Sequence, residues 1–268
     1  MDLFILLFGL IMGSFTNVLI YRLPRGESVV LPGSHCTNCN HPLAWYDNIP
    51  ILSYIMLRGK CRYCGTSISF QYPLVEAINA LCYLLLFWSY GLTLDFLFLA
   101  LISSMLIAIS GTDMTRQVIP DILVISVFML SIIHKVLAYF LYHESPEIWQ
   151  SVLGLIAAGG LFLLITVVSK GGMGQGDVTL ISALGFALGL KKILLVIFLS
   201  FVIAACASLI LLGTKTKTLK DPIPFGAFIV VAFFITVFLG DMLIGWYIGL
   251  LTAERGFECN AVWREGYS

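Results

Sequence analysis

The chain has 268 residues, of which 59% are hydrophobic and only 11% are charged, and its mean hydropathy is +0.98. Soluble domains carry about 25% charged residues, so this chain cannot cover a water-facing surface, and we expect the lipid bilayer to be its solvent. Its 15 basic and 15 acidic residues balance to a net charge of zero, which gives no indication of nucleic-acid binding.

Apolar runs along the chain predict an all-α polytopic membrane protein with about eight transmembrane helices. A spanning helix needs about 20 mostly apolar residues. The first run lacks a basic flank and a small-residue cleavage site, so we interpret it as a retained helix rather than a signal peptide. The run at 178–190 is short, and the last run is long enough to be tilted or broken. The runs are 3–20, 74–90, 96–110, 122–141, 152–169, 178–190, 193–213 and 225–252.

Basic residues in the connecting segments predict the orientation of these helices. The polar segment 22–73 contains five basic residues, so we expect it in the cytoplasm, with the N-terminus outside. Lys191 and Lys192 are the basic pair that this topology places on the outer side. Counting spans from the polar segment puts Asp113 and Asp177 at the same cytoplasmic face, although they are about 60 positions apart in the sequence.

Two Cys-x-x-Cys pairs in the polar segment predict a metal site. They are separated by 21 residues and comprise Cys36, Cys39, Cys61 and Cys64. Four thiolates in this pattern suit tetrahedral Zn²⁺, which would stabilise a segment too small to fold on a core of its own. The alternative is a pair of disulfides or redox-active thiols. A cytoplasmic location and an odd total of seven cysteines argue against structural disulfides.

Asp113 and Asp177 are the predicted catalytic pair. Carboxylates near a bilayer are costly and indicate function. Two carboxyl groups that share one proton can hydrolyse a peptide, because the ionised group activates water and the protonated group polarises the scissile carbonyl. Asp177 follows a stretch with four glycines among residues 171–176, and glycines such as Gly174 and Gly176 allow a substrate backbone to approach closely.

Two other interpretations of these aspartates remain open. Aspartates commonly cap helix N-termini, and Asp177 precedes an apolar run. A glycine-rich loop ahead of a helix can also bind phosphate, but Lys170 precedes the glycines, which is the wrong position for a P-loop lysine.

The order of several motifs resembles that of the type IV prepilin peptidases, also called leader peptidase/N-methyltransferases. The resemblance covers residues from about 9 to about 250. It rests on GSFTNVLIYRLP at 13–24, the two cysteine pairs, WYDNIP at 45–50, QYPLVE at 71–76, Asp113 with IPD at 119–121, GQGD at 174–177 and PIPFG at 222–226.

The resemblance implies a bifunctional enzyme of the bacterial inner membrane. Such an enzyme cleaves the leader of type IV prepilins and pseudopilins after a glycine, on the cytoplasmic side, and then methylates the new N-terminus with S-adenosylmethionine. Asp113 and Asp177 would be its aspartyl protease dyad. The other site residues carried over are Gly13, Asn17, Arg22 and Glu76 for the methyl donor, and Gly174, Gly176, Pro224 and Gly226 for the substrate and its loops.

The expected domains are a first helix at 1–21, a zinc-binding methyltransferase segment at 22–73, a peptidase core at 74–252 and a tail at 253–268. Many family members have a basic residue two positions after the second aspartate, where this chain has Thr179. A peptidase without methyltransferase activity and an ion-coupled transporter are the alternatives. The cysteine-containing segment argues against the first, and carboxylates at one face rather than at the midplane argue against the second. The sequence does not predict an oligomeric state.

Overall fold

The computed structural model describes residues 1–142, 147–170, 172–214 and 223–262, with side chains described as far as residue 250. Within these ranges the regular elements are helices, and the chain pairs as β-structure only in two isolated bridges. The helices are α1 (Asp2–Arg22), η1 (Leu23–Arg25), η2 (Trp45–Asn48), α2 (Leu52–Met56), α3 (Gln71–Tyr90), α4 (Leu94–Arg116), α5 (Asp121–Tyr142), α6 (Ile148–Val168), α7 (Gln175–Gly213) and α8 (Phe225–Val262).

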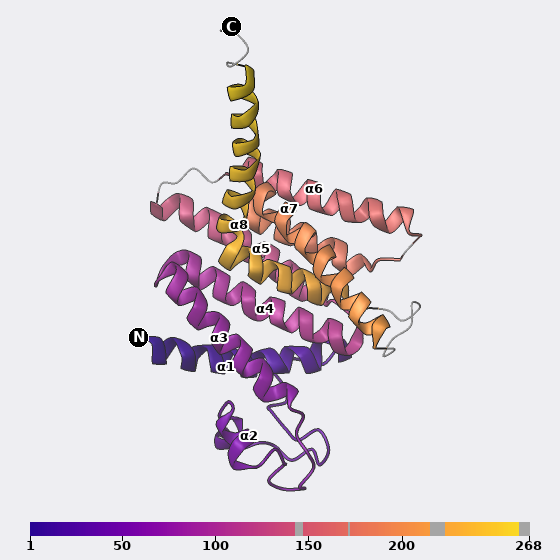
Figure 1. The fold of residues 1–268 in the computed structure, drawn as a ribbon. Helices are drawn as coiled ribbons and strands as arrows, with labels where there is room; N and C mark the ends of the chain where they lie inside the picture. The colour runs from indigo at the N-terminus through magenta and orange to yellow at the C-terminus, as the bar shows by residue number, and fades with distance from the viewer. Residues whose placement is uncertain (143–146, 171, 215–222, 263–268) are drawn as a thin grey trace.

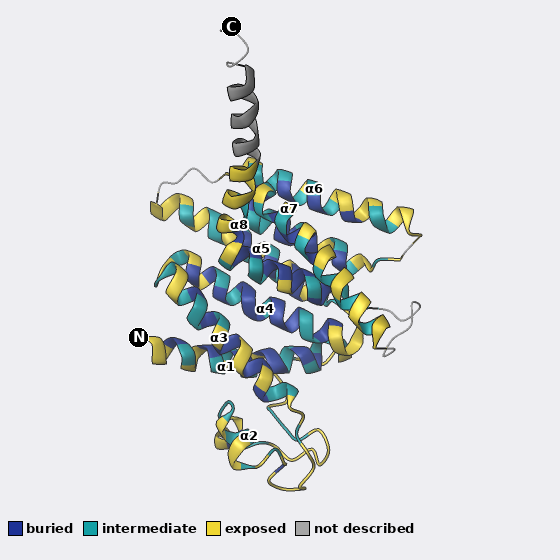
Figure 2. Cartoon of the chain, in the orientation of Figure 1, coloured by how far each residue is buried: buried dark blue, intermediate teal, exposed yellow. Residues whose placement is uncertain are grey.

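The long helices form a membrane bundle, as the hydropathy predicted (Figure 1). Among the described residues, seven helices are long and apolar enough to cross a bilayer. Their inward faces share one buried apolar cluster that includes Tyr83, Leu106 and Phe233. Their outward faces expose large apolar side chains such as Phe4, Phe198 and Trp246, as Figure 2 shows for the bundle as a whole. Lipid is the solvent that suits such a surface.

Helix α7 contains two of the predicted spans, 178–190 and 193–213, which turn back on each other at Gly189. The backbone there has φ 76° and ψ 173°, a conformation that is open almost only to glycine. Gly154 near the start of α6 lies against Gly185 and Gly189, whereas Phe162, further along α6, contacts Phe201 in the second half of α7. The two halves therefore run in opposite directions beside α6 (Figure 1). Counted this way, the described residues cross the bundle eight times, as predicted.

Glycines allow the closest helix contacts. A Cβ atom at Gly154 would lie 2.3 Å from the carbonyl oxygen of Gly185, and a Cβ atom at Gly9 would lie 2.7 Å from Cα of Ala80 on α3. In lipid, where apolar burial gives little driving force, such close backbone approach is a main source of helix association. The α6–α7 and α1–α3 contacts both position functional residues.

The segment between α1 and α3 projects from one end of the bundle as a small separate layer (Figure 1). Its only helices are η1, η2 and the short α2, and most of its residues are exposed or half-buried (Figure 2). Because it buries so little apolar surface, this segment needs another source of stability. At the opposite end of the sequence, residues 263–268 of the predicted tail lie outside the described residues.

Candidate active site and metal centre

The four predicted cysteine ligands come together in the projecting segment. Their sulfur atoms all lie within 4.8 Å of one another, and the Cys36 and Cys64 sulfurs are 3.8 Å apart. A tetrahedral site with Zn–S bonds of about 2.3 Å has sulfurs about 3.8 Å apart. All four are free thiols rather than disulfides. The cluster therefore has the donor set and spacing to hold a metal ion.

Each cysteine pair lies in a tight turn. The bridge between His35 and Pro42 closes the first turn, and the bridge between Lys60 and Ser67 closes the second. In the first turn, hydrogen bonds from the backbone of Cys39 and Asn38 lower the pKa of Cys36. In the second, hydrogen bonds from Thr66 lower the pKa of Cys64 to about 6. Both shifts favour the thiolate, which is the form that binds a metal. The pKa of Cys39 moves the other way: despite a hydrogen bond from the His41 backbone, burial and the adjacent Cys36 and Cys64 sulfurs raise it to about 11. A cation bound among the four sulfurs would favour the thiolate of Cys39 as well.

Asp113 is buried in the last turn of α4. Its Oδ2 accepts a hydrogen bond from the backbone N–H of Ala227, 3.2 Å away at the start of α8. A Cβ atom at Gly226 would lie 2.9 Å from the same oxygen. The predicted proline-containing motif, with Pro224 immediately before α8, thus brings the N-terminus of α8 onto the first aspartate.

Asp177 is buried in the first turn of α7, two residues after the helix begins. Its carboxylate accepts a hydrogen bond from the backbone of Gly174 and interacts electrostatically with Asp113. In this geometry the side chain reaches back to cap the N-terminus of its own helix. The helix-capping interpretation of Asp177 therefore accounts for its contact with Gly174. Its Oδ1 is buried and has no partner within the described residues, and that oxygen is left for water or substrate.

Ile119 joins the two aspartate motifs. A Cβ atom at Gly176 would lie 2.8 Å from Cβ of Ile119, and one at Gly226 would lie 2.9 Å from its Cδ1. The start of α7, the segment that follows α4 and the start of α8 therefore meet at one end of the bundle. Thr179 is exposed and donates its hydroxyl to the carbonyl of Gly176, 3.0 Å away, so its hydroxyl is satisfied within its own helix.

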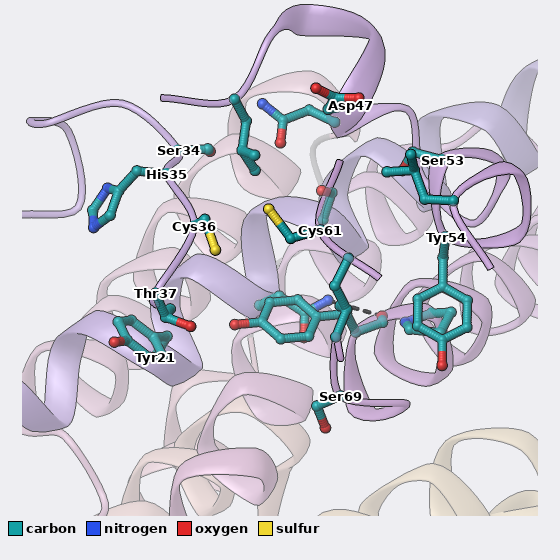
Figure 3. A pocket seen from close by; sticks show the side chains of 18 of the residues that line it. Tyr21, Ser34, His35, Cys36, Thr37, Asp47, Ser53, Tyr54, Cys61 and Ser69 are labelled. Atoms are coloured by element: carbon teal, nitrogen blue, oxygen red, sulfur yellow. Dashed lines mark hydrogen bonds between the residues drawn. The ribbon is translucent and has the colours of Figure 1, made fainter. Parts of the chain in front are cut away.

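A cavity of about 470 Å³ lies between the projecting segment and the ends of α1 and α3 (Figure 3). Three of the four predicted methyl-donor residues line it, namely Asn17, Arg22 and Glu76. Gly13 does not: a Cβ atom there would lie 2.6 Å from Cα of Glu76, so Gly13 lets α1 pack closely against α3. Its contribution to the cavity is indirect, through the position of Glu76.

The three lining residues also make internal hydrogen bonds. Asn17 donates to the carbonyl of Tyr72, 3.0 Å away, and Glu76 accepts from the backbone N–H of Ile51 at 2.7 Å. Arg22 is buried and donates to the carbonyls of Ser28 and Gly33. These bonds hold the projecting segment against α1 and α3. Because Arg22 already donates to two backbone carbonyls, we interpret its role as structural rather than as direct binding of a ligand.

Asp47 is a buried carboxylate in the cavity wall that was not among the predicted site residues. It lies within the WYDNIP motif, between the two cysteine pairs, and this motif is the sequence feature that could have indicated it. Its Oδ1 pairs with Arg62 at 2.8 Å. Because Arg62 lies between Cys61 and Cys64, the ion pair ties η2 to the second cysteine turn.

Family models match both parts of this architecture. Residues 7–90 match the bacterial peptidase A24 N-terminal domain, and residues 100–209 match the type IV leader peptidase family. The chain belongs to the type IV leader peptidase family. The first match covers α1, the cysteine cluster and α3, and the second covers both aspartates.

Several relatives are similar over nearly their whole length. Prepilin leader peptidase/N-methyltransferases from Stutzerimonas stutzeri and Pseudomonas aeruginosa are each 32% identical, over 91% of this chain and 92% of the relative. The protein of the same name from Bacillus subtilis is 34% identical, over 90% of this chain and 96% of its own. No solved structure matches the chain. The protein is therefore a membrane enzyme of the type IV leader peptidase family, and the family models and the relatives favour neither the transporter nor the peptidase-only alternative.

Proposed function

We propose that this protein is a prepilin leader peptidase and N-methyltransferase that cleaves its substrate at Asp113 and Asp177 and methylates it in the cavity beneath the cysteine cluster. Family membership and the names of the relatives support both activities. The observation that carries the assignment of residues is that Gly176, next to Asp177, and Gly226, against Asp113 Oδ2, both pack on Ile119. This is the end of the bundle where Thr115 and Arg116 of α4 lie beside residues that line the cavity.

In this proposal the two aspartates act as one acid–base pair. The ionised carboxylate takes a proton from water, and the resulting hydroxide adds to the scissile carbonyl. The protonated carboxyl donates a hydrogen bond to the carbonyl oxygen as it becomes tetrahedral. A proton then passes to the amide nitrogen, the C–N bond breaks, and the leader leaves with a new carboxylate. Ala227 N–H fixes the orientation of Asp113, and Oδ1 of Asp177, which has no partner within the described residues, is left to interact with the water or the scissile carbonyl.

The substrate class follows from the place of the pair at the membrane edge. A prepilin has a basic leader followed by an apolar helix. That helix can lie in the bilayer beside the exposed apolar faces of the bundle, with its N-terminal junction at the level of the aspartates. Gly174 lies immediately before α7 and next to the Asp177 carboxylate, whereas Gly176 is in the first turn of α7 and packs against Ile119. In this proposal the extended substrate backbone approaches Asp177 beside Gly174. Cleavage after a glycine, which has no side chain to obstruct such an approach, is the expected reaction.

The cysteine cluster is proposed to bind Zn²⁺. The 3.8 Å separation of the Cys36 and Cys64 sulfurs and the thiolate-favouring environments of both residues support this metal. Its role is structural, because all four coordination positions are taken by cysteines.

The cavity is proposed to bind S-adenosylmethionine, and its residues fit that ligand. The volume of about 470 Å³ falls in the range of small-molecule sites, about 300–1,000 Å³. The walls combine tyrosine and leucine side chains with the carboxylates of Asp47 and Glu76, which suits a ligand that is partly aromatic and carries positive charge. When bound, this cofactor supplies the methyl group. Glu76 and Asn17 on the membrane side of the cavity are placed to receive the peptide amine.

A second, smaller cavity of about 120 Å³ lies toward the peptidase side. It shares Asn17, Tyr21, Gln71 and Tyr72 with the larger cavity and is also lined by Thr115 and Arg116, which closely follow Asp113 on α4. A cleaved product therefore has a short path from the aspartates to the methyl-transfer cavity without leaving the membrane. This arrangement supports cleavage followed by methylation on one chain.

The proposed location is the bacterial inner membrane, with both sites at the cytoplasmic face. The end of the bundle that carries them also carries Arg22, Arg25 and Arg116, in keeping with the excess of basic residues in cytoplasmic loops. Lys192, at the other end, pairs with Asp241 at 3.1 Å.

The test is a two-step assay on the purified protein. Incubation with an intact prepilin and labelled S-adenosylmethionine is expected to give a shorter pilin that carries one labelled methyl group on its new N-terminal nitrogen, as read by mass spectrometry. Cleavage without incorporation of the labelled methyl group would show that the protein is a peptidase without methyltransferase activity. A substrate that stays uncleaved would exclude the proposed function.

A further inference from the structure

Ile119 is the side chain that lies between the two aspartate motifs. The atoms nearest to a Cβ atom at Gly176 would all belong to Ile119, and the closest would be its own Cβ at 2.8 Å. The atoms nearest to a Cβ atom at Gly226 would be Oδ2 of Asp113 and Cδ1 of Ile119, each at 2.9 Å. One end of the Ile119 side chain therefore lies beside the Asp113 carboxylate, and its base lies against the residue that precedes Asp177.

The backbone on both sides of Ile119 fixes its position. Helix α4 ends at Gln117, whose left-handed backbone (φ 54°, ψ 40°) turns the chain. Pro120 follows Ile119 and restricts it to an extended conformation, and a β-branched side chain has few rotamers. Ile119 packs against the apolar core but is only half-buried. It is therefore a rigid apolar wall with part of its surface accessible next to the aspartates.

The place of Ile119 bears on which residue can precede the cleaved bond. The carbonyl of that bond must come within hydrogen-bonding distance of the aspartate pair. A β-carbon on the residue that supplies this carbonyl is two bonds from the reacting carbon, so it must fit within a few ångströms of the carboxyl groups. Gly174, Gly176 and Gly226 present no side chain there, whereas Ile119 presents a branched one.

We propose that Ile119 is a specificity-determining residue, whose side chain fills the space next to Asp113 that a β-carbon of the substrate would need. This inference rests on the proposed peptidase function. A substrate glycine at this position can contact Ile119 without overlap. An alanine or a larger residue would displace the scissile carbonyl from the aspartates, because a packed apolar wall yields little to an added methyl group. Ile119 thus selects for glycine immediately before the cleaved bond.

The test compares two prepilins that differ only in glycine or alanine immediately before the cleaved bond. Steady-state cleavage is measured with the purified protein in detergent. The wild type is expected to prefer glycine by about 10–200-fold in kcat/KM, the range for a single methyl group in an apolar site. Ile119→Ala is expected to lower this preference by about tenfold. Ile119→Val removes only Cδ1, the atom beside Asp113, and keeps Cβ against Gly176, so it is expected to lower the preference by a smaller factor.

The preference is a ratio of two substrates on one preparation, so partial loss of folding would lower both rates and leave the ratio unchanged. Val118→Ala is the matched control, because it removes methyl groups from the adjacent, exposed residue, and its ratio is expected to equal that of the wild type. A second pair of prepilins differs in the size of the residue after the cleaved bond. Ile119→Ala is expected to leave the ratio for that pair unchanged.

Three results would overturn the inference while leaving the peptidase in place. The first is an unchanged glycine preference in the Ile119 variants, with Ile119→Val deciding if Ile119→Ala is inactive. The second is a relaxed preference only for the residue after the cleaved bond, which would place Ile119 on the other side of the cut. The third is equal cleavage of the glycine and alanine prepilins by the wild type. Failure of the wild type to cleave either prepilin would instead remove the proposed peptidase function itself.

Discussion

The backbone N–H of Ala227 donates a hydrogen bond to Oδ2 of Asp113 across 114 positions of the sequence. This contact joins the end of α4 to the start of α8 and fixes one member of the aspartate pair. Gly226, the residue before the donor, approaches the same oxygen so closely that a Cβ atom would lie 2.9 Å from it. The geometry of the pair therefore depends on the absence of a side chain at residue 226.

Gly226→Ala is expected to reduce prepilin cleavage by about a hundredfold, because displacing a catalytic group by about 1 Å has effects of that size. Methylation of a peptide that is already cleaved should be unchanged, since the cavity lies elsewhere. Gly245→Ala on the same helix is the matched control, because a Cβ atom there meets nothing within 4 Å. Equal cleavage by the two variants would show that Gly226 does not position Asp113.

Gly154→Ala is expected to destabilise the bundle. The added methyl group would lie 2.3 Å from the carbonyl oxygen of Gly185, and overpacking of this kind costs about 1–3 kcal/mol. The midpoint of thermal unfolding in detergent should fall, and cleavage should fall with it, because α6 supports the first half of α7 and hence Asp177. Gly160→Ala on the same helix has open space around it, and a similar loss there would refute the packing explanation.

Removal of the metal with a chelator is expected to unfold residues 23–70 and to leave the membrane bundle intact. The segment buries few apolar side chains, so the proposed metal would contribute much of its stability. Limited proteolysis should show new cuts between α1 and α3, and binding of S-adenosylhomocysteine should be lost, because the segment forms one side of the cavity. Unchanged protease resistance after complete metal removal would show that the segment is stable without the metal.

The proposed orientation of the bundle predicts opposite results for two reporter fusions. A phosphatase that is active only outside the cytoplasm should be active when it is fused after Gly91, at the proposed outer end of α3, and inactive when it is fused after Gln117, at the end of α4. The reverse pattern would place the aspartates on the outer face and would contradict the proposed site of cleavage.

Hydropathy and motif order predicted most of this architecture. The spans, the cysteine cluster and the shared end of the two aspartate helices follow from local composition, from side-chain chemistry and from counting passes. The turn at Gly189 agrees with the separation of runs 178–190 and 193–213, because a glycine can adopt the positive φ of 76° that allows two helices to reverse without a loop.

The contacts that shape the two sites could not be predicted, because each depends on tertiary packing. No local pattern indicates that Ala227 would meet Asp113, or that Ile119 would lie between Gly176 and Gly226. Gly13 was selected as a methyl-donor residue because it stands in a motif, whereas in the structure it is a helix contact under Glu76. Asp47 stands in the WYDNIP motif, but the sequence alone does not indicate that its side chain is buried against Arg62.

The most direct test of the central claim is single-turnover cleavage of a prepilin by Asp113→Asn and Asp177→Asn, with methylation of a pre-cleaved peptide measured on the same samples. Each substitution removes an acid–base group, so the cleavage rate should fall by about 10²–10⁴-fold or more, while methylation continues at the wild-type rate. Cleavage at the wild-type rate by either variant would contradict the account.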